Sequence, residues 1–317
     1  MKARSGAPGA RILAVADHRP ARSVSNDDLS QVLDTSDEWI RERTGIAHRG
    51  VADAAESVVA MAADAAGKAL AAAGVDPAQV DLVVLASCTM PTPIPGGAAR
   101  LARLIGAGSP GAYDVNGACA GFCYGLAAAA DAVRAGSARY VVVAGAERLS
   151  DWLDWTDRST AVIFGDGAGA VVVGPADEPG IGPVVWGSDG DRHALIQVPS
   201  GGHLEMDGPA VFRWATTSLA AIAEQACDAA GIAPSDLAAF VPHQANLRII
   251  TAVVRRLAIP DVVIADDIVS AGNTSSASIP MALTALQAEG RVAGGDLALL
   301  LGFGAGLTWA GQVVRVP

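Results

Sequence analysis

One cysteine stands in surroundings that suit a nucleophile. Cys119 lies among small residues in the stretch Asn116-Gly-Ala-Cys-Ala-Gly121, directly before an Ala-rich apolar run. The run 121–133 has helical length and Asn116-Gly117 is typical of a turn, so we expect Cys119 at a helix N-terminus. There the peptide dipoles favour a thiolate, and small neighbours let a backbone N–H face an oxyanion, as acyl transfer requires. A buried cysteine that only packs as a small hydrophobe is the competing interpretation.

Two polar side chains further along the chain could act with such a cysteine. His243, in Val241-Pro-His-Gln-Ala-Asn246, follows a predicted strand, and ligand-binding groups of open α/β sheets gather at the C-terminal ends of strands. Asn273 lies in the turn-like stretch Ala271-Gly-Asn-Thr-Ser-Ser276. A lone histidine is more often structural than catalytic. The place of both residues in an internal repeat favours the functional interpretation.

The elements that must position these residues alternate between helices and short buried strands. A helix over 57–73 ends at Gly74, and the apolar runs 81–86 and 140–144 have the composition of strands. This alternation predicts an α/β protein. The glycine-rich stretch 165–170 leads into a strand-like run rather than a helix, so we interpret it as a tight strand connection and not as a nucleotide loop.

The second half of the chain repeats the first at one offset. Ala72-Ala-Gly-Val-Asp-Pro77 recurs as Ala229-Ala-Gly-Ile-Ala-Pro234, which places Gly231 157 residues after Gly74. The same offset carries Asn116 onto Asn273 and Gly145 onto Gly302. We therefore predict two duplicated α/β halves, residues 1–174 and 175–317, joined in a Pro/Gly-rich segment. The first half supplies Cys119, and the second supplies the histidine and the asparagine.

Composition and charge exclude several classes of function. Of the 317 residues 51% are apolar, 4% aromatic and 17% charged, and the formal net charge of −11 argues against nucleic-acid binding. The sequence shows no signal-peptide core and no window like a membrane span, so we expect a cytoplasmic protein without a membrane segment. The cysteines at 88, 119, 123 and 227 are then expected to be reduced, and no zinc-site spacing surrounds them, so no metal is expected.

With these features in place, the sequence resembles the condensing enzymes of the thiolase superfamily, most closely the β-ketoacyl-acyl-carrier-protein synthase III family. The resemblance covers nearly the whole chain. Its motifs are Thr35-Ser-Asp-Glu-Trp, Arg43-Thr-Gly-Ile, Ala118-Cys-Ala-Gly-Phe122, Asp157-Arg158, Gly165-Asp-Gly-Ala-Gly, His243-Gln-Ala-Asn-Leu-Arg248, Gly272-Asn-Thr-Ser and Gly302-Phe-Gly-Ala-Gly306. It implies a thiolase-like fold, with the two halves in a layered αβαβα arrangement.

The resemblance also implies a set of site residues. The family's catalytic triad falls on Cys119, His243 and Asn273, and the backbone N–H groups of Cys119 and Ala305 would hold the oxyanion. Contacts to the substrate are expected at Thr35, Trp39, Arg43, Arg158, Asn246, Met206, Phe212, Phe303 and Ile94. Among these, Trp39 and Arg158 would meet adenine, Thr35 and Arg43 the phosphates, and Asn246 the pantetheine arm. Ile94 would line the acyl pocket of the partner in a homodimer. Arg248 would meet an acidic carrier protein.

The implied reaction is a decarboxylative condensation in two stages. Cys119 takes the acyl group from an acyl-coenzyme A, which is a substrate and not a cofactor. Malonyl-acyl carrier protein then loses carbon dioxide, while His243 and Asn273 donate hydrogen bonds to its thioester carbonyl, and the carbanion attacks acyl-Cys119. The product is a 3-oxoacyl carrier protein, the first intermediate of fatty-acid synthesis.

Alternatives remain open from the sequence. A ketosynthase III-like enzyme could prime a polyketide pathway or pass the acyl group to another acceptor without condensation. A non-catalytic dimer partner is disfavoured because the nucleophile and both donors are present. A biosynthetic thiolase would need a second cysteine near Gly302-Phe-Gly-Ala-Gly306, which has none. The segment 188–206 is shorter than the family leads us to expect, which leaves the acyl-chain preference open.

Overall fold

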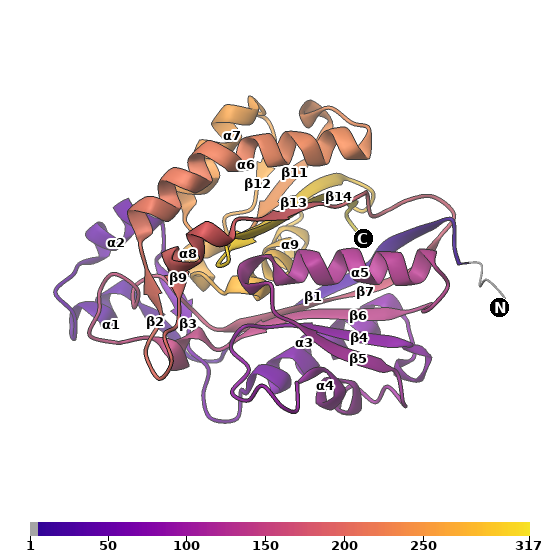
Figure 1. Ribbon diagram of the computed structural model, residues 1–317, viewed down its shortest axis with the longest axis horizontal. Coiled ribbons are helices and arrows are strands. Elements are labelled where there is room, and N and C mark those ends of the chain that lie inside the picture. Colours follow the sequence, from indigo (N-terminus) through magenta and orange to yellow (C-terminus); the bar gives the residue numbers. More distant parts are fainter. Residues whose placement is uncertain (1–5) are drawn as a thin grey trace.

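A computed structural model describes residues 6–317, and its centre consists of two five-stranded sheets (Figure 1). The first sheet has the order β1-β7-β6-β4-β5 and the second has the order β12-β11-β13-β14-β8. The strands of the first sheet are β1 (Gly9–His18), β4 (Leu82–Ala86), β5 (Gly111–Val115), β6 (Val141–Glu147) and β7 (Gly167–Ala176). Those of the second are β8 (Val185–Ser188), β11 (Ala239–Pro242), β12 (Val263–Ile264), β13 (Leu297–Gly304) and β14 (Thr308–Arg315).

The two sheets have the same topology at the offset found in the sequence. Each sheet has one strand that pairs in parallel with a neighbour on both sides, β4 in the first sheet and β11 in the second. Two further strands with antiparallel pairing complete each sheet. The central strands begin at Leu82 and Ala239, which are 157 residues apart. The short helices η2 (Ala118–Ala120) and η6 (Ser275–Ala277) also differ by 157. Ala118 and Ser275 share a left-handed φ, of 45° and 47°. The predicted duplication is confirmed.

Helices cover and separate the sheets. The longer helices are α3 (Val58–Ala73), α4 (Ala98–Leu104), α5 (Gly121–Arg134), α6 (Gly208–Ala230), α7 (Leu247–Leu257) and α9 (Ser278–Ala288). Helices α5 and α9 contact strands of both sheets and lie between them, whereas α3 and α4 cover the outer face of the first sheet. Helices α6 and α7 cover the outer face of the second sheet (Figure 1). The layers are therefore αβαβα, as expected.

The layers pack because the strands are apolar on both faces. Strand β4 is a run of valine, leucine and alanine, and β6 begins with Val-Val-Val-Ala. Every residue of β6 is buried, as is typical of strands with helices on both sides. Helix α3 begins at the capping serine Ser57 and ends at Gly74, whose φ of 64° is left-handed. Strand β7 continues to Ala176, two residues past the expected limit of the first half.

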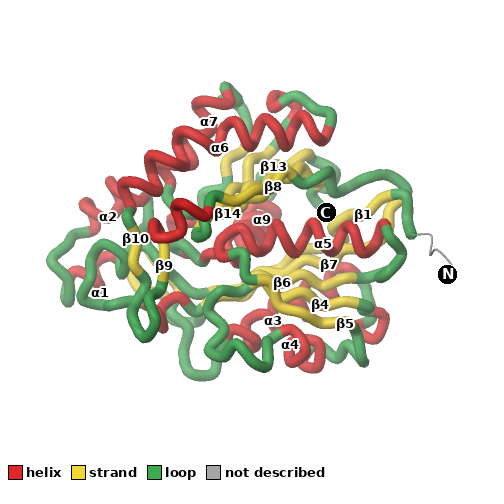
Figure 2. The backbone as a smooth tube through the Cα atoms, in the orientation of Figure 1, coloured by secondary structure: helices red, strands yellow, loops and turns green. Residues whose placement is uncertain are grey.

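A smaller group of elements extends from one end of the sheets (Figure 2). It contains α1 (Asn26–Ser30), α2 (Asp37–Thr44), α8 (Ile268–Ala271), the strand pair β2 (Ser23–Ser25) and β3 (His48–Gly50), and the strand pair β9 (Ile196–Gln197) and β10 (Glu205–Met206). In residues 6–317, no helix is long and apolar enough to cross a membrane.

Candidate functional site

A cavity of about 600 Å³ lies where the two halves meet the smaller group of elements. The sequence-predicted residues that line it are Trp39, Arg43, Cys119, Arg158, Met206, Phe212, His243, Asn246, Arg248, Asn273 and Phe303. Three other predicted residues, Thr35, Ile94 and Ala305, are not part of this lining. Within the described range 6–317, no group of three His, Cys, Asp or Glu side chains could hold a metal ion.

Cys119 lies in η2, immediately before the N-terminus of α5. The Ser275 hydroxyl and the backbone N–H groups of Cys119 and Ala305 lower the pKa of this thiol. Burial nevertheless raises the pKa of this thiol to about 11. The expectation that the helix end favours a thiolate is therefore wrong for the resting protein, because desolvation outweighs the local donors. The same donors can stabilise negative charge that forms on an acyl group bound to the sulfur.

Gly304, the last residue of β13, lies so close to the Cys119 side chain that it limits the space around the sulfur. A Cβ atom at Gly304 would lie 2.8 Å from Sγ and 2.7 Å from Cβ of Cys119. Gly304→Ala is therefore expected to displace Cys119 and to slow its acylation about a hundredfold, since a shift near 1 Å can have that effect. Gly67→Ala is the matched control, because Gly67 lies in α3 and a methyl group added there would have no neighbour within 4 Å. Rapid-quench acylation measurements that find Gly304→Ala as fast as wild type would contradict this.

His243 follows β11 at the base of the cavity. The side chain is 1% exposed, and its Nδ1 lies 2.7 Å from the Ser278 hydroxyl oxygen. The ring of Phe303 contacts it edge-on, with centroids 5.3 Å apart. Burial lowers the pKa of His243 to about 3, so the imidazole is neutral at physiological pH. With Nδ1 engaged by Ser278, Nε2 is the nitrogen available to a ligand in the cavity.

Asn273 is held in a turn that the other half of the chain reproduces. Its Oδ1 accepts the N–H of Ser275 at 2.9 Å, and its own N–H donates to the Ile163 carbonyl. In the first half, Asn116 Oδ1 accepts the N–H of Ala118 at 3.3 Å, which is the same turn at the same offset. Since the turn uses Oδ1 of Asn273, its Nδ2 is the group that can donate into the cavity.

At the outer end of the cavity, Trp39 lies on α2 beside two arginines. The guanidinium carbons of Arg43 and Arg158 are 4.3 and 5.0 Å from the centre of the Trp39 ring. Arg158 also donates to the Asp34 carbonyl at 2.7 Å. This arrangement offers a π face and two positive charges, which suits an adenine with phosphates. Thr35 lies nearby in sequence, but its hydroxyl is buried and has no hydrogen-bond partner within residues 6–317.

Between the two ends, the cavity wall combines a short hairpin and two helices. Met206 pairs with Ile196 in the β9–β10 hairpin, and both side chains line the cavity, so the short segment 188–206 still covers it. Phe212 on α6 lies against the Arg248 guanidinium, with 5.3 Å from the ring centre to the guanidinium carbon. Asn246 caps α7 by accepting the Arg248 N–H and donates to a backbone carbonyl of α2 at 2.9 Å.

Sequence analysis missed one buried carboxyl near the nucleophile. Glu147, at the end of β6, is fully buried and contacts the hydroxyls of Thr89 at 2.6 Å and Ser276 at 2.7 Å, and the Cys88 N–H at 3.1 Å. Ser276 is the counterpart of Cys119 at the offset of 157 residues. Glu147 thus joins the turn that carries Asn273 to the first half. Only this pairing of repeats could have drawn attention to it.

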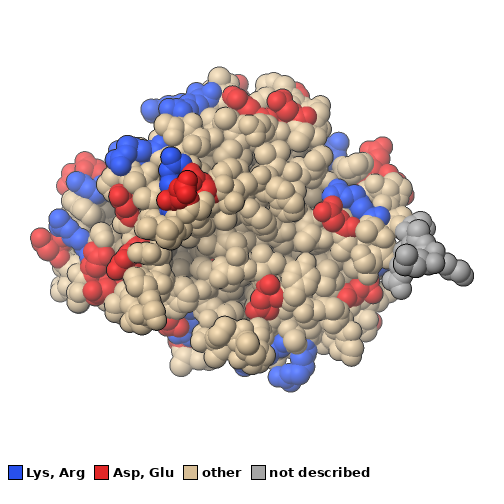
Figure 3. Space-filling view, viewed as in Figure 1, with Lys and Arg blue, Asp and Glu red and all other residues tan. Residues whose placement is uncertain are grey.

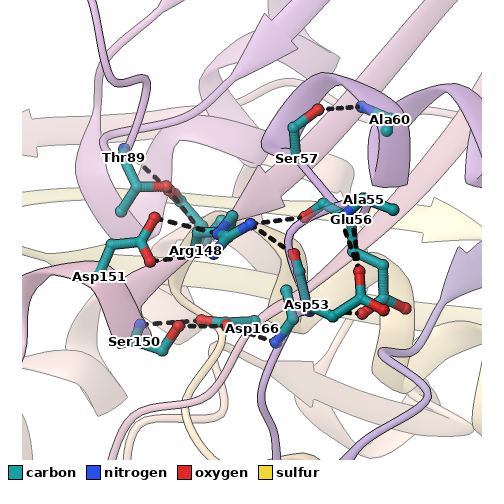
Figure 4. A network of polar contacts seen from close by, with 12 residues as sticks. Asp53, Ala55, Glu56, Ser57, Ala60, Thr89, Arg148, Ser150, Asp151 and Asp166 are labelled. Carbon is teal, nitrogen blue, oxygen red and sulfur yellow. Dashed lines mark hydrogen bonds and ion pairs between the residues drawn. The ribbon is translucent and has the colours of Figure 1, made fainter.

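A second polar network lies around Arg148, the residue that follows Glu147, and includes Thr89, Asp53 and Asp151 (Figure 4). The Arg148 N–H donates to Thr89 Oγ1, and its guanidinium donates to the Asp53 carbonyl at 2.7 Å and pairs with Asp151. These bonds fix the chain at 89, where the proline-rich loop that carries Ile94 begins. The exposed Ile94 side chain, with 86% of its surface accessible, therefore projects from a loop with an anchored base.

Glu147 should influence the pH dependence of stability. Burial raises its pKa above the usual value, so the folded protein retains a proton that the unfolded chain releases as the pH rises above about 4.5. Stability then falls as the pH rises from about 4.5 towards the pKa of Glu147 in the folded protein, and Glu147→Gln is expected to reduce this fall.

Glu147→Ala is expected to lower Tm by about 5–10 °C, because several buried donors lose their acceptor. Thermal unfolding between pH 4 and 8 tests both, and a steeper fall for Glu147→Gln would contradict the assignment.

Comparison with known proteins agrees with this geometry. Residues 113–190 match the family model described as 3-Oxoacyl-[acyl-carrier-protein (ACP)] synthase III, and residues 227–316 match the model of its C-terminal part. The chain is 50% identical over 313 residues to Beta-ketoacyl-[acyl-carrier-protein] synthase III 4 of Streptomyces coelicolor, with 98% of this chain and 99% of the relative covered.

Solved structures agree as well. The priming β-ketosynthase from the R1128 polyketide biosynthetic pathway has a TM-score of 0.96 and 46% identity, with 99% of this chain and 98% of that chain covered. The 3-oxoacyl-[acyl-carrier-protein] synthase III from Aquifex aeolicus has a TM-score of 0.93 and 38% identity, with 97% and 100% covered. The chain therefore belongs to the β-ketoacyl-acyl-carrier-protein synthase III family of condensing acyltransferases with a thiolase-like fold.

Proposed function

We propose that this condensing enzyme joins an acyl-coenzyme A primer to malonyl-acyl carrier protein through an acyl-Cys119 intermediate. The observation that carries the proposal is the meeting of Cys119, His243 and Asn273 in one cavity. The outer end of the same cavity, with Trp39 and its arginines, suits the nucleotide end of coenzyme A. Products would be a 3-oxoacyl-acyl carrier protein, coenzyme A and carbon dioxide.

In the first stage the Cys119 sulfur attacks the thioester carbonyl carbon. A carbon–sulfur bond forms, the bond to the coenzyme A sulfur breaks, and the proton lost by Cys119 passes to the leaving thiolate. The tetrahedral oxyanion accepts hydrogen bonds from the backbone N–H groups of Cys119 and Ala305, which also lower the pKa of the thiol. These donors compensate for the burial that disfavours charge on the free thiol.

In the second stage malonyl-acyl carrier protein takes the place of coenzyme A. Asn273 Nδ2 and Nε2 of His243 donate to the thioester carbonyl, so that the electrons released by loss of carbon dioxide form an enolate. The enolate carbon attacks the acyl carbonyl, and the Cys119 sulfur leaves and takes up a proton. Phe303, packed against His243, excludes water from the carbanion. Arg248 at the cavity mouth supplies positive charge for an acidic carrier protein.

A starter-unit role in a polyketide pathway is the second candidate. It is favoured by the similarity to a structure described as a priming β-ketosynthase of such a pathway. The chemistry at Cys119 would be the same, and only the primer and the carrier protein would differ. Initiation of fatty-acid synthesis remains the first candidate.

The four cysteines are free thiols in the structure, in keeping with a reaction in the reducing cytoplasm.

The proposal includes a homodimer that shares the acyl pocket. Strand β5 lies at an edge of the first sheet and could pair with a second copy. Ile94, Tyr113 and Trp186 are exposed apolar side chains, and Trp186 stacks on Tyr124 of α5. Figure 3 shows few charged side chains over α5, whereas charges gather around the rim of this face. An Ile94 that enters the partner's pocket would leave more room for branched primers than an aromatic residue would.

Trp39 should contribute to the affinity for the nucleotide. Trp39→Ala is expected to raise KM for acyl-coenzyme A about tenfold, because stacking on a base contributes roughly 1–3 kcal/mol. The same variant should leave KM for the corresponding acyl-pantetheine unchanged, since that substrate lacks adenine. Trp155→Ala is the matched control, because Trp155 lies outside the cavity lining. An equal rise in KM for both substrates would contradict the assignment.

The proposed reaction is tested by the mass of the carrier protein. The enzyme is incubated with malonyl-acyl carrier protein and, in separate samples, with acetyl-, isobutyryl- or longer acyl-coenzyme A. Conversion of the malonyl form to the matching 3-oxoacyl form is the expected result, and the fastest primer identifies the preference of the pocket. Unchanged malonyl-acyl carrier protein with every primer would refute the condensation.

A further inference from the structure

Ser278, the first residue of α9, contacts His243 but is not part of the cavity lining. Both side chains are 1% exposed, and the Ser278 hydroxyl oxygen lies 2.7 Å from Nδ1 of the imidazole. The same hydroxyl lies 2.8 Å from the Ser275 carbonyl oxygen and accepts the Gln244 N–H at 3.3 Å. Ser278 is therefore the side chain that holds this ring through Nδ1.

The hydrogens in this group can be assigned by counting donors. A hydroxyl has one hydrogen, and a carbonyl oxygen can only accept. The bond from Ser278 to the Ser275 carbonyl uses that hydrogen, so the bond to Nδ1 needs a hydrogen on the ring. A neutral imidazole carries a hydrogen on one nitrogen only. This count favours a resting His243 that has its hydrogen on Nδ1 and a lone pair on Nε2.

The proposed condensation needs the opposite arrangement, because Nε2 must donate to the thioester carbonyl. An imidazolium would donate from both nitrogens, but burial lowers the pKa of His243 to about 3 and disfavours it. A bare Nδ1 needs a hydrogen-bond donor, and the Ser275 carbonyl has no hydrogen to donate. The Ser278 hydroxyl can donate to Nδ1 if its hydrogen turns from the Ser275 carbonyl to the ring.

Building on the proposed function, we propose that Ser278 is a positioning residue whose hydroxyl serves both hydrogen arrangements of His243. As an acceptor it holds Nδ1–H in the resting protein, and as a donor it holds bare Nδ1 while Nε2–H faces the substrate. Since Nδ1 faces Ser278 and not the cavity, the exchange needs the ring to turn briefly away from Ser278. Nδ1 then gives its proton to water in the cavity and Nε2 takes one from it, so the ring keeps one hydrogen throughout.

The resting arrangement is tested by long-range proton–nitrogen NMR on protein labelled at the histidine ring nitrogens. The protein has five histidines, and the signals of His243 are those lost in His243→Ala. Wild type should show hydrogen on Nδ1 and none on Nε2, and Ser278→Ala should shift the hydrogen between the two nitrogens. Hydrogen on Nε2 in the resting wild type, or an unchanged spectrum in Ser278→Ala, would overturn the proposal. This measurement needs no substrate, so it stands apart from any failure of condensation.

The catalytic consequence is tested by measuring the two stages separately. Ser278→Ala should slow condensation about ten- to a hundredfold, as is typical when a supporting hydrogen bond is lost, and change acylation of Cys119 less than about twofold. Ser278→Thr keeps the hydroxyl and should recover most of the rate. Thr284→Ala, which removes a hydroxyl bonded to a backbone carbonyl of the same helix, should match wild type. An equal loss in both stages would mean that Ser278 only supports the fold and would overturn the proposal, whereas wild type that acylates but never condenses would refute the proposed function instead.

Discussion

Cys119→Ala is expected to lower condensation by about four orders of magnitude or more, because Cys119 is the one thiol in the described lining of the cavity. The side chain lies between the N-terminus of α5 and the close backbone of Gly304, where only a small residue fits. Alanine fits that space, so the fold should be unaffected. The loss would be measured as the rate at which malonyl-acyl carrier protein is converted to the 3-oxoacyl form.

Cys227→Ala is the matched control for this prediction. Cys227 is another buried thiol, but it lies on α6 in the core of the second half, outside the lining of the cavity. It should condense at the wild-type rate. Condensation by Cys119→Ala at more than about a tenth of the wild-type rate would show that the acyl group does not pass through Cys119.

His243→Ala is expected to separate the two stages of the reaction. Condensation should fall about a hundred- to a thousandfold, which is the usual effect of removing one donor to a developing oxyanion. Acylation should change only a few fold, because the donors proposed for its oxyanion are the backbone N–H groups of Cys119 and Ala305 and not the imidazole. The acylation rate therefore also reports that the variant is folded. Rapid-quench measurements of each stage provide the comparison.

The opposite pattern would contradict the assigned role. If His243→Ala lost acylation and condensation to the same extent, His243 would act on Cys119 and not on the malonyl thioester. If neither stage changed, the contact of Phe303 with His243 would be a packing contact only.

The sequence predicted the elements and the repeat because both leave strong local patterns. The helix expected over 121–133 is α5, Gly121–Arg134, since an Ala-rich run between turn residues has few other solutions. The duplication was visible because Gly74 and Gly231 end equivalent helices in left-handed conformations that require glycine. Two matching strand orders then follow from two matching halves.

The state of the site residues was harder to predict. The pKa of Cys119 depends on how much water the finished fold removes, and the local helix end alone pointed in the wrong direction. Ser278 gave no signal, and Glu147 gave none apart from the pairing of the repeats, because a single glutamate after a strand and a serine at a helix start are ordinary features. Glu147 contacts Ser276, which lies more than a hundred residues further along the chain, and Ser278 on α9 contacts His243 at the end of β11. Both contacts form only in the folded protein, so the local sequence does not reveal them.

The proposed mechanism depends above all on an acyl group that is carried by Cys119 and then consumed by malonyl-acyl carrier protein. The intact mass of the enzyme follows this intermediate, first after acyl-coenzyme A is added and then after malonyl-acyl carrier protein, with Cys119→Ser alongside. Wild type should gain one acyl mass and the variant none, and wild type should then lose that mass as the 3-oxoacyl product forms. An acyl-enzyme that remains loaded in the presence of malonyl-acyl carrier protein would contradict the mechanism and would indicate transfer to another acceptor.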